Sequence, residues 1–413
     1  MTDPLPFPTR LFLLLASVVA MTSCAGAPEA TLVGWATIPP DTFVVGPTSG
    51  QFIEGANGKT PPFRDRQPVQ GFSALIRGTD GTYLALPDNG FGRKDNSADF
   101  VLRVYVLRPD FRTAEGGSGT IEVESAFLLR DPNHLIAFPI VADGYAYPNS
   151  DIPVDPSIRD GRLLTGADFD VESFRQIPDG TFYFGDEFGP FLLHTDANGI
   201  LVEPPIPLPG LLSPEHPELG GSAPTLGSSS GFEAMALGTD GVQLLPMLEH
   251  PLEGAGAVLN VYAFDLAKGQ YTALHPDSAT YRYGLDTAAI SVSEITTWSG
   301  DDYLVIERDG GQGPTARFKR VFAVNLFRLD ANGILDKEEI LDLLLISDPH
   351  DLSGFGTGLL RYDFETTEAL VIVDDSTVGI INDNNYPFGK ARIENTGEPD
   401  PTEFLLVRIR RPG

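Results

Sequence analysis

Asp170-Val-Glu-Ser173, Gly231-Phe-Glu-Ala234 and Val292-Ser-Glu-Ile295 each place a glutamate at the same point of a similar local pattern. The three glutamates follow one another at equal intervals along the chain. Each begins a short apolar run, which is followed by a turn and by a second run that ends in further carboxylates. Similarity at a fixed period is the signature of a repeat architecture.

Further copies extend the repeat in both directions. Gly71-Phe-Ser-Ala74 starts an earlier copy, with Ser73 in place of the glutamate. Ser353-Gly-Phe-Gly-Thr-Gly358 starts a later copy that lacks the glutamate, and Ala369-Leu-Val-Ile-Val373 is predicted as its second strand. Each unit reads as strand, turn, strand, acidic loop, strand, turn and strand, which is the four-stranded blade of a β-propeller.

Third strands with aromatic or β-branched side chains are predicted at matching points of four units. They comprise Leu102–Leu107, Phe191–His194, Asn260–Phe264 and Arg320–Val324. The stretch from Asp143 to Arg162 is predicted as a loop inserted between two units. Only Asp336 to Leu345 favours a helix, which we interpret as a short excursion.

The predicted fold is all-β: a single β-propeller of about six (five to seven) four-stranded blades. The ring is closed by the N- and C-terminal strands, because joining both ends removes exposed edge strands. The sixth blade would be assembled from Thr31-Leu-Val-Gly-Trp35 and Glu403-Phe-Leu-Leu-Val-Arg408.

The net charge of the chain limits the classes of partner that the protein can bind. The 413 residues include 57 acidic and 28 basic side chains, and the net charge of −29 argues against a nucleic-acid partner, whose phosphates require Lys and Arg. The same charge suits a protein that gathers cations, although a solvated acidic surface explains most of it. We expect a monomer that acts on a small molecule.

The N-terminus predicts export. Arg10 precedes an apolar stretch, 11–20, that is too short to span a bilayer and suits a signal-peptide core. Cys24, the only cysteine, follows Met21-Thr-Ser and lies where bacterial lipoproteins are cleaved and acylated. Cleavage near Ala27 without a lipid, or a retained segment, are the alternatives.

We therefore predict three parts of the chain: a signal peptide of lipoprotein type (1–23), a tether (24–30) and the propeller domain (31–413). The mature protein would lie in the periplasm or at the cell surface, and its one contact with a membrane would be the lipid on Cys24. With a single cysteine, no disulfide can form within the chain.

Carboxylates that recur at one place of each blade would converge on the central channel. Like charges crowd there unfavourably unless a cation or proton lies between them, and calcium takes six to eight oxygen ligands. Alternatively, the glutamates bond backbone amides of neighbouring blades. The predicted metal ligands are the ring glutamates together with acids of the rim loops: Asp88, Glu172, Asp186, Glu187, Glu233, Glu294, Glu307, Asp309, Asp374 and Asp383.

Basic residues beside these acidic loops could bind phosphate oxygens, although ordinary ion pairing explains them equally well. The candidate phosphate ligands are Arg93, Lys94, Arg308, Arg317 and Lys319. Glu187, Glu294 and Arg308 are the candidate catalytic residues. No Gly-x-Ser-x-Gly elbow is present, so a covalent serine mechanism has little support.

Several of these motifs together resemble the bacterial "esterase-like activity of phytase" family, over nearly the whole predicted mature chain. The matching stretches include Gly71-Phe-Ser-Ala74, Asp88-Asn-Gly-Phe-Gly92, Asp168-Phe-Asp-Val-Glu-Ser173, Gly185-Asp-Glu-Phe-Gly189, Gly231-Phe-Glu-Ala234 and Asn382-Asp-Asn384. The resemblance implies a propeller related to calcium-dependent phytases, exported, often lipid-anchored, and acting on phosphoric esters.

The expected function is that of an exported, calcium-dependent hydrolase of phosphoric esters, a phosphatase or phosphodiesterase. It would use a central acidic metal site and a metal-activated water. One alternative is a non-catalytic, calcium-stabilised propeller lipoprotein that binds a ligand or partner. Another is a lactonase-type propeller esterase, which also uses a central calcium.

Overall fold

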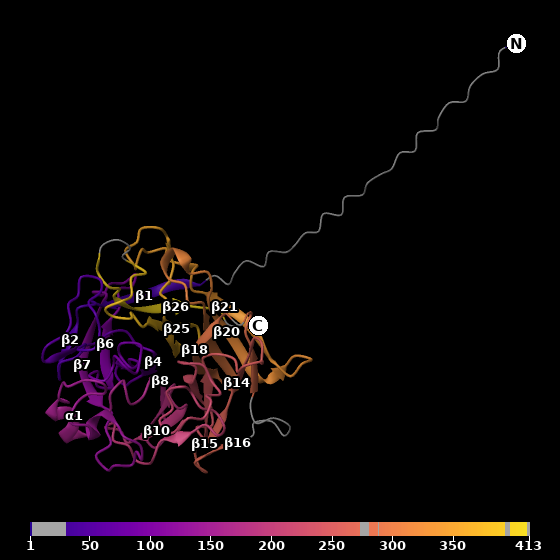
Figure 1. Ribbon diagram of the computed structural model, residues 1–413. Coiled ribbons are helices and arrows are strands. Elements are labelled where there is room, and N and C mark those ends of the chain that lie inside the picture. Colours follow the sequence, from indigo (N-terminus) through magenta and orange to yellow (C-terminus); the bar gives the residue numbers. More distant parts are fainter. Residues whose placement is uncertain (2–29, 273–280, 288, 393–396, 411–413) are drawn as a thin grey trace.

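The protein is all-β, as the sequence predicts (Figure 1). The computed structural model describes residues 1, 30–272, 281–287, 289–392 and 397–410. Within these residues the only helices are α1 (Pro156–Gly161) and two 3-10 turns, Val141–Asp143 and Gly313–Thr315. The predicted signal peptide, Cys24 and most of the tether lie outside the described residues.

The first two sheet units are antiparallel and follow chain order from the first strand to the fourth. Unit 1 contains β4 (Ala74–Arg77), β5 (Tyr83–Leu86), β6 (Arg103–Asp110) and β7 (Thr120–Leu128). Unit 2 contains β8 (Val171–Gln176), β9 (Phe182–Asp186), β10 (Phe191–Thr195) and β11 (Ile206–Pro207). Between them, the predicted inserted loop, 143–162, carries α1, and the first 3-10 turn leads into it.

Units 3 and 4 share one sheet. Unit 3 contains β12 (Phe232–Leu237), β13 (Gln243–Leu248), β14 (Val258–Val261), β15 (Ala263–Asp265), β16 (Gln270–Thr272) and β17 (Tyr281–Gly284). Both β14 and β15 pair with β13, β14 also pairs with β17, and β15 also pairs with β16. Unit 4 contains β18 (Ser291–Ser299), β19 (Asp302–Arg308), β20 (Lys319–Leu329) and β21 (Leu335–Asp342). The four predicted third strands are confirmed as β6, β10, β14 with β15, and β20.

Unit 5 combines both ends of the described chain. Its strands are β24 (Thr367–Asp374), β25 (Thr377–Asn382), β26 (Thr402–Arg408) and, antiparallel to β26, β1 (Thr31–Ile38). The short strands β22 (Ile346–Ser347) and β23 (Leu359–Leu360) pair beside β1, and β2 (Phe43–Val45) pairs with β3 (Arg66–Pro68). The terminal strands therefore complete the fifth unit, and the sixth blade predicted from them is wrong.

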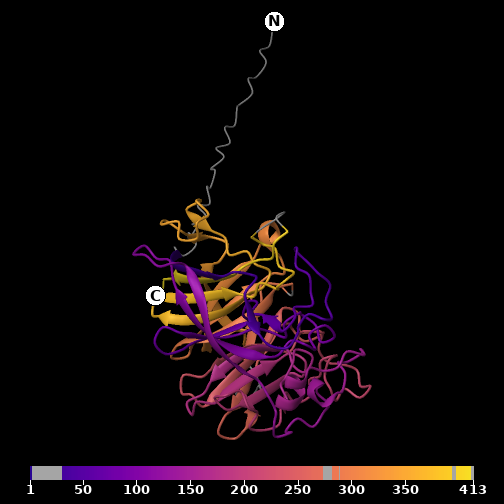
Figure 2. The same cartoon turned by 90° about the vertical axis from the view of Figure 1, so that its left-hand side faces the viewer.

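The first strands of the five units lie next to one another in chain order, β4, β8, β12, β18 and β24, and β24 in turn lies against β4. Figure 1 shows the indigo start of the described chain beside its yellow end, and Figure 2 shows the same neighbours after a 90° turn. A parallel bridge between Thr37 of β1 and Thr120 of β7 joins unit 5 to unit 1.

Apolar cores lie between successive units. Phe174 and Phe184 of unit 2 pack with Val104 of unit 1, and Phe404 of unit 5 packs with Tyr83 of unit 1. Along β1 the side chains alternate between buried and partly exposed, because successive side chains of a strand point to opposite faces. This alternation sets one face of the terminal strand against the core.

Tight turns set the strand order within units. In Asp196-Ala-Asn-Gly199 and Asp330-Ala-Asn-Gly333, the aspartate Oδ1 accepts backbone N–H groups two and four residues ahead. Gly199 and Gly333 have φ angles of 78° and 73°, which glycine adopts without steric cost. The predicted helical excursion at Asp336–Leu345 is wrong: after the second turn the chain continues as β21, because β20 offers it an unpaired edge.

No helix within the described part of the chain is both long and apolar enough to cross a membrane.

Candidate metal centre

A β-bulge near the start of a first strand re-aims one side chain in several units. The partner register skips one residue between Val171 and Ser173, between Phe232 and Ala234, and between Thr367 and Ala369. The skipped residues are Glu172, Glu233 and Glu368. Because a bulge adds one residue to one strand only, the extra side chain leaves the normal alternation and can turn toward a site.

Unit 4 breaks this pattern. Its register skips between Val292 and Glu294, so the bulge residue is Ser293, whose Oγ donates to the Thr367 carbonyl at 2.6 Å. Glu294 stays in the regular ladder opposite Ile306, where it is buried and accepts a hydrogen bond from Arg175 Nη2 at 2.6 Å. Glu294 follows the other two glutamates at the same sequence interval, but it lies one residue after the bulge position that they occupy. The structure therefore does not bring Glu294 to the acidic cavity described next.

Acidic side chains from units 1, 2, 3 and 5 line one small cavity of about 140 Å³. Eight carboxylates take part: Asp88, Asp170, Glu172, Glu187, Glu233, Glu249, Glu368 and Asp383. Arg308, at the end of β19 in unit 4, is the basic residue among the lining residues. Its Nη2 lies 3.1 Å from Glu368, 3.4 Å from Glu249 and 3.6 Å from Glu233. We call this cavity, with the eight carboxylates and Arg308 that line it, the acidic cavity.

Burial and mutual repulsion dominate the electrostatics of the cavity. Loss of solvent, reinforced by neighbouring carboxylates, raises the pKa values of Asp88, Asp170, Glu172, Glu187 and Glu233 well above the ordinary range. Such shifts mean that the ionised forms lack enough positive charge around them.

In two further members of the cavity, the charge of Arg308 opposes the rise in pKa. Burial raises the pKa of Glu368 to about 7 although Arg308 opposes the shift, and burial raises the pKa of Asp383 to about 6. Burial alone would lower the pKa of Arg308, but the surrounding carboxylates more than offset it, so this pKa is raised and the guanidinium stays charged. One arginine cannot balance eight carboxylates.

The donor set fits a hard cation. One oxygen each from Asp88, Asp170 and Glu172 lies within 4.8 Å of the others, and the same holds for Glu172, Glu187 and Glu233. Two buried oxygens of the cavity, Oε1 of Glu187 and Oε2 of Glu368, have no hydrogen-bond partner among the residues that the structure describes. Carboxylate oxygens are ligands that calcium prefers. Glu172 belongs to both groups.

Hydrogen bonds fix the carboxylates of units 1 and 2. The Asn89 side chain donates to Asp170 Oδ2 at 2.7 Å, and Gly90 N donates to Asp88 Oδ1 at 2.8 Å. Asp186, a predicted metal ligand, accepts from the backbone N–H of Asp170 at 2.8 Å and of Gly189 at 2.7 Å. Asp186 does not line the cavity; it holds the loop that presents Asp170 and Glu187.

Three more predicted ligands lie elsewhere. Glu307 is buried beside Lys337 and accepts from the Tyr283 hydroxyl at 2.6 Å. Asp309 accepts hydrogen bonds from two backbone N–H groups of its own loop, Arg317 N at 2.8 Å and Phe318 N at 3.0 Å. Asp374 is exposed at the turn between β24 and β25, where it accepts from Ser376 N at 2.8 Å. Each of these carboxylates already has a structural role.

Of the predicted phosphate ligands, only Arg308 lines the acidic cavity. Arg93 is paired with Asp95 at 3.2 Å, and its side chain is 72% exposed. The Arg317 guanidinium donates to backbone carbonyls of its own loop. Lys319 is fully buried and bonds the Glu365 carbonyl at 3.0 Å, while burial lowers its pKa to about 8.

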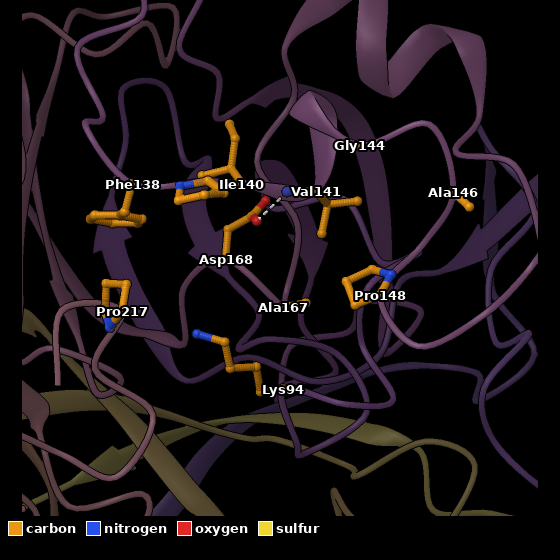
Figure 3. A pocket seen from close by; sticks show the side chains of 11 residues that line it. Lys94, Phe138, Ile140, Val141, Gly144, Ala146, Pro148, Ala167, Asp168 and Pro217 are labelled. Carbon is orange, nitrogen blue, oxygen red and sulfur yellow. Dashed lines mark hydrogen bonds between the residues drawn. The ribbon is translucent and has the colours of Figure 1, made fainter. Parts of the chain in front are cut away.

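Lys94 points into a separate cavity of about 210 Å³ (Figure 3). Apolar side chains such as Phe138, Val141 and Pro217 surround it there, together with Asp168. Its Nζ donates to the Glu215 carbonyl at 3.1 Å. Lys94 therefore lies outside the acidic cavity and holds the chain at Glu215.

Three members of the acidic cavity escaped the sequence analysis as ligands. Asp170 and Glu249 lie inside the repeated motifs, at the start of the Asp170–Ser173 pattern and at the end of β13. Glu368 precedes Ala369, which starts the run predicted as a second strand; the structure shows that this run is the first strand of unit 5. A comparison of Thr367-Glu-Ala369 with Phe232-Glu-Ala234 could have found it.

A family model described as "Phytase-like: Esterase-like activity of phytase" matches residues 67–386, well over half of the chain. The chain belongs to this family. The matched region of this phytase-like protein contains all eight carboxylates of the acidic cavity and Arg308. No curated protein matches the sequence.

Solved structures similar to the phytase-like protein cover most of it at low identity. A PQQ-bound aldose sugar dehydrogenase from Streptomyces coelicolor is 9% identical, with a TM-score of 0.36, over 93% of this chain and 100% of that one. A luciferin-regenerating enzyme is 10% identical, with a TM-score of 0.38, over 94% and 96%. A virginiamycin B lyase from Staphylococcus aureus is 11% identical, with a TM-score of 0.33, over 83% and 95%. At these values the likenesses carry no inference about function.

Proposed function

We propose that the protein is an exported, calcium-dependent hydrolase of phosphoric esters. The observation that carries the proposal is the acidic cavity, in which eight carboxylates face a single arginine. Oxygens of five of them lie close enough together, in two groups, to share a cation, and among the described residues Oε1 of one of these five, Glu187, has no hydrogen-bond partner. The family description, which names an esterase-like activity of phytase, supports the hydrolysis of esters.

In this proposal Asp88, Asp170, Glu172, Glu187 and Glu233 hold calcium, since they form the two groups of converging oxygens. Bound calcium would offset the charge of the phosphate group and lower the pKa of a water molecule. Hydrolysis breaks the bond between phosphorus and the oxygen of the organic group; water provides the new oxygen on phosphorus and a proton for the departing alcohol.

Arg308 is the residue of this chain suited to orient the phosphate. Its Nη2 is shared among three carboxylates, whereas its buried Nε has no hydrogen-bond partner within the described residues. A guanidinium forms strong, directional hydrogen bonds to phosphate oxygens. Arg308 would therefore place the ester against the carboxylate-bound cation while keeping its own ion pairs.

The proposal takes the five sheet units as the blades of one closed propeller, with β1 closing the ring. It also takes the mature chain to be a monomer outside the cytoplasm, anchored through a lipid on Cys24. Calcium sites in extracellular modules typically have dissociation constants of about 10⁻⁴–10⁻³ M, which suits a site that is filled only after export.

Phosphate release from a panel of phosphoric esters, measured with calcium and with a chelator, tests the proposal. We expect turnover with calcium only. Glu172→Gln should weaken calcium binding at least about tenfold by calorimetry, because Glu172 belongs to both oxygen groups. Asp374→Asn, at an exposed turn, is the matched control and should bind calcium like the unmodified protein.

Three results would each overturn a part of the proposal. If calcium binds and raises the melting temperature but no ester is hydrolysed, the non-catalytic, calcium-stabilised propeller is the correct reading. If Glu172→Gln and Asp374→Asn bind calcium equally well, the acidic cavity is not the metal site. Turnover of lactones in place of phosphoric esters would support the lactonase-type alternative.

A further inference from the structure

A second cavity of about 220 Å³ adjoins the acidic cavity. Three residues, Gly92, Thr366 and Asn385, line both. A ligand whose charged group lies among the carboxylates can therefore extend its remaining atoms into the second cavity. This cavity is the natural place for the organic part of an ester.

Two aromatic side chains and glycine backbone form the apolar side of the second cavity. Phe91 is buried and packs on Phe100, with 5.5 Å between ring centroids, whereas Phe388 is 41% exposed. Gly92 has a φ angle of 81°, and a Cβ atom added there would meet nothing within 4 Å. The peptide at Gly92 therefore presents a bare surface, and an exposed aromatic ring beside it suits contact with a flat apolar group.

The charge of the second cavity should discriminate between ligands more strongly than its apolar side does. Glu365 is its one charged lining residue, and its Oε2 accepts from Gln312 Nε2 at 3.1 Å. Among the described residues that line either cavity, Arg308 is the only one with a basic side chain. A further phosphate on the organic part would meet the Glu365 carboxylate and, among the described lining residues of the second cavity, no basic side chain, and an unpaired charge of this kind selects against a ligand.

Building on the proposed ester hydrolysis, we propose that the second cavity binds the organic part of the substrate, and that this part is an uncharged aromatic group without further phosphates. The volume agrees, since an apolar cavity of about 150 Å³ in another protein takes up benzene. The protein would thus prefer aromatic monoesters to highly phosphorylated polyols.

Benzyl phosphate and methyl phosphate test this preference, because their leaving alcohols are similarly basic and differ mainly in the ring. With calcium, we expect kcat/KM for benzyl phosphate to exceed that for methyl phosphate roughly tenfold, and inositol hexakisphosphate to be the poorest substrate. Phe388→Ala should reduce the benzyl value about fivefold, as the loss of an aromatic contact implies, and leave the methyl value unchanged.

Phe327→Ala is the matched control. Phe327 is also an exposed phenylalanine, but it lines a different cavity with Tyr281 and Tyr303. This variant should leave both esters unaffected. Equal kcat/KM values for the two esters, or faster hydrolysis of the inositol polyphosphate, would overturn the preference while leaving the proposed hydrolysis intact.

Binding of the non-hydrolysable benzylphosphonate and methylphosphonate to the calcium-loaded protein separates the two proposals. If no ester is hydrolysed, the proposed function fails, yet the subsite is still supported when benzylphosphonate binds more tightly and Phe388→Ala removes the difference. If the two phosphonates bind equally well, the subsite is wrong whatever the activity.

Discussion

At the residue scale, Arg308 joins three sheet units. It extends from β19 of unit 4 to Glu233 and Glu249 of unit 3 and to Glu368 of unit 5. The surrounding carboxylates raise its pKa, so it is a permanent positive charge inside the cavity. Removing one partner of a buried ion pair typically costs about 3–5 kcal/mol, because the other charge is left uncompensated.

We therefore expect Arg308→Met to lower the free energy of unfolding by about 3 kcal/mol in a chelator. Calcium should recover part of the loss, since a cation can replace the missing charge between the glutamates. Guanidinium chloride unfolding with and without calcium measures both effects. Arg93→Met, at a side chain that is 72% exposed, is the control and should change little. An equal loss in calcium and in chelator would contradict this role.

Asp99 is a buried carboxylate away from the acidic cavity. Its Oδ2 accepts from Gln51 N at 2.7 Å, and its Oδ1 has no hydrogen-bond partner within the described part of the chain. Burial raises its pKa from 3.8 to about 6. Because the pKa is higher in the folded protein, folding favours the protonated form. The stability that Asp99 contributes is present at low pH and is lost as the pH rises from about 4 to about 6.

Asp99→Asn should remove this pH dependence. We expect the free energy of unfolding of the unmodified protein to fall relative to the variant by about 2 kcal/mol between pH 4 and pH 6, and to run nearly parallel to it above that range. Urea unfolding of both proteins across this interval is the measurement. A constant difference between the two curves would show that Asp99 does not titrate there.

The repeat made part of the site predictable. Asp88, Glu172 and Glu233 recur within motifs, and all three reach the acidic cavity. The position of Glu294 could not be predicted from the repeat, because a bulge displaces the side-chain alternation by one residue without changing the period of the sequence. The structural role of Glu307 could not be predicted either, because its partner Lys337 comes from a strand that the sequence pattern indicated as a helical excursion.

At the element scale, glycines that precede first strands allow neighbouring units to approach closely. A Cβ atom on Gly231 would lie 2.4 Å from the Cα of Glu187, and one on Gly71 would lie 2.2 Å from the backbone N of Asn384. Both contacts are with backbone that leads into an acidic loop. These glycines therefore set the distance between carboxylates of adjacent units.

Gly231→Ala should push the Glu187 loop away from Glu233. We expect a loss of about 1–3 kcal/mol in unfolding free energy, the usual cost of overpacking, together with weaker calcium binding. Gly310→Ala is the control, because a Cβ there meets nothing within 4 Å. Calorimetric calcium titration and chemical unfolding of both variants measure the two effects. Unchanged calcium affinity in Gly231→Ala would show that the spacing is not critical.

Strand order within units was predictable where turns are explicit. The Asn-Gly turns at Gly199 and Gly333 and the aromatic third strands mark it directly in the sequence. The strand order of unit 5 was predicted wrongly, because the chain before its first strand forms the short pair β22 and β23 and irregular segments in place of an explicit turn. The run 369–373 then looked like a second strand, although it pairs with β25 as the first.

At the scale of the whole molecule, β1 is the outer strand of unit 5. Leu32, Ala36 and Ile38 of this strand are buried, and its ladder with β26 runs from Thr31 to Ile38. Without β1, the edge of β26 would be unpaired, and such edges promote association with other chains.

A variant that begins at Pro39 should therefore lose on the order of 5 kcal/mol, from the buried side chains of β1 alone, and should associate in solution. A variant that begins at Ala30 keeps β1 and should match the full chain. Chemical unfolding and size-exclusion chromatography compare the two. Equal stability of both variants would show that β1 does not hold unit 5 together.

The pairing of β1 with β26 also orders events in time. β1 and β26 lie near opposite ends of the described residues, so almost all of the chain between them must be synthesised before this ladder can form. Contacts so distant in sequence slow folding, because a long loop must close before they form. Closure of unit 5 is therefore expected to be a late event of folding, whereas the strands of units 1, 2 and 4 pair with neighbours that are close in sequence.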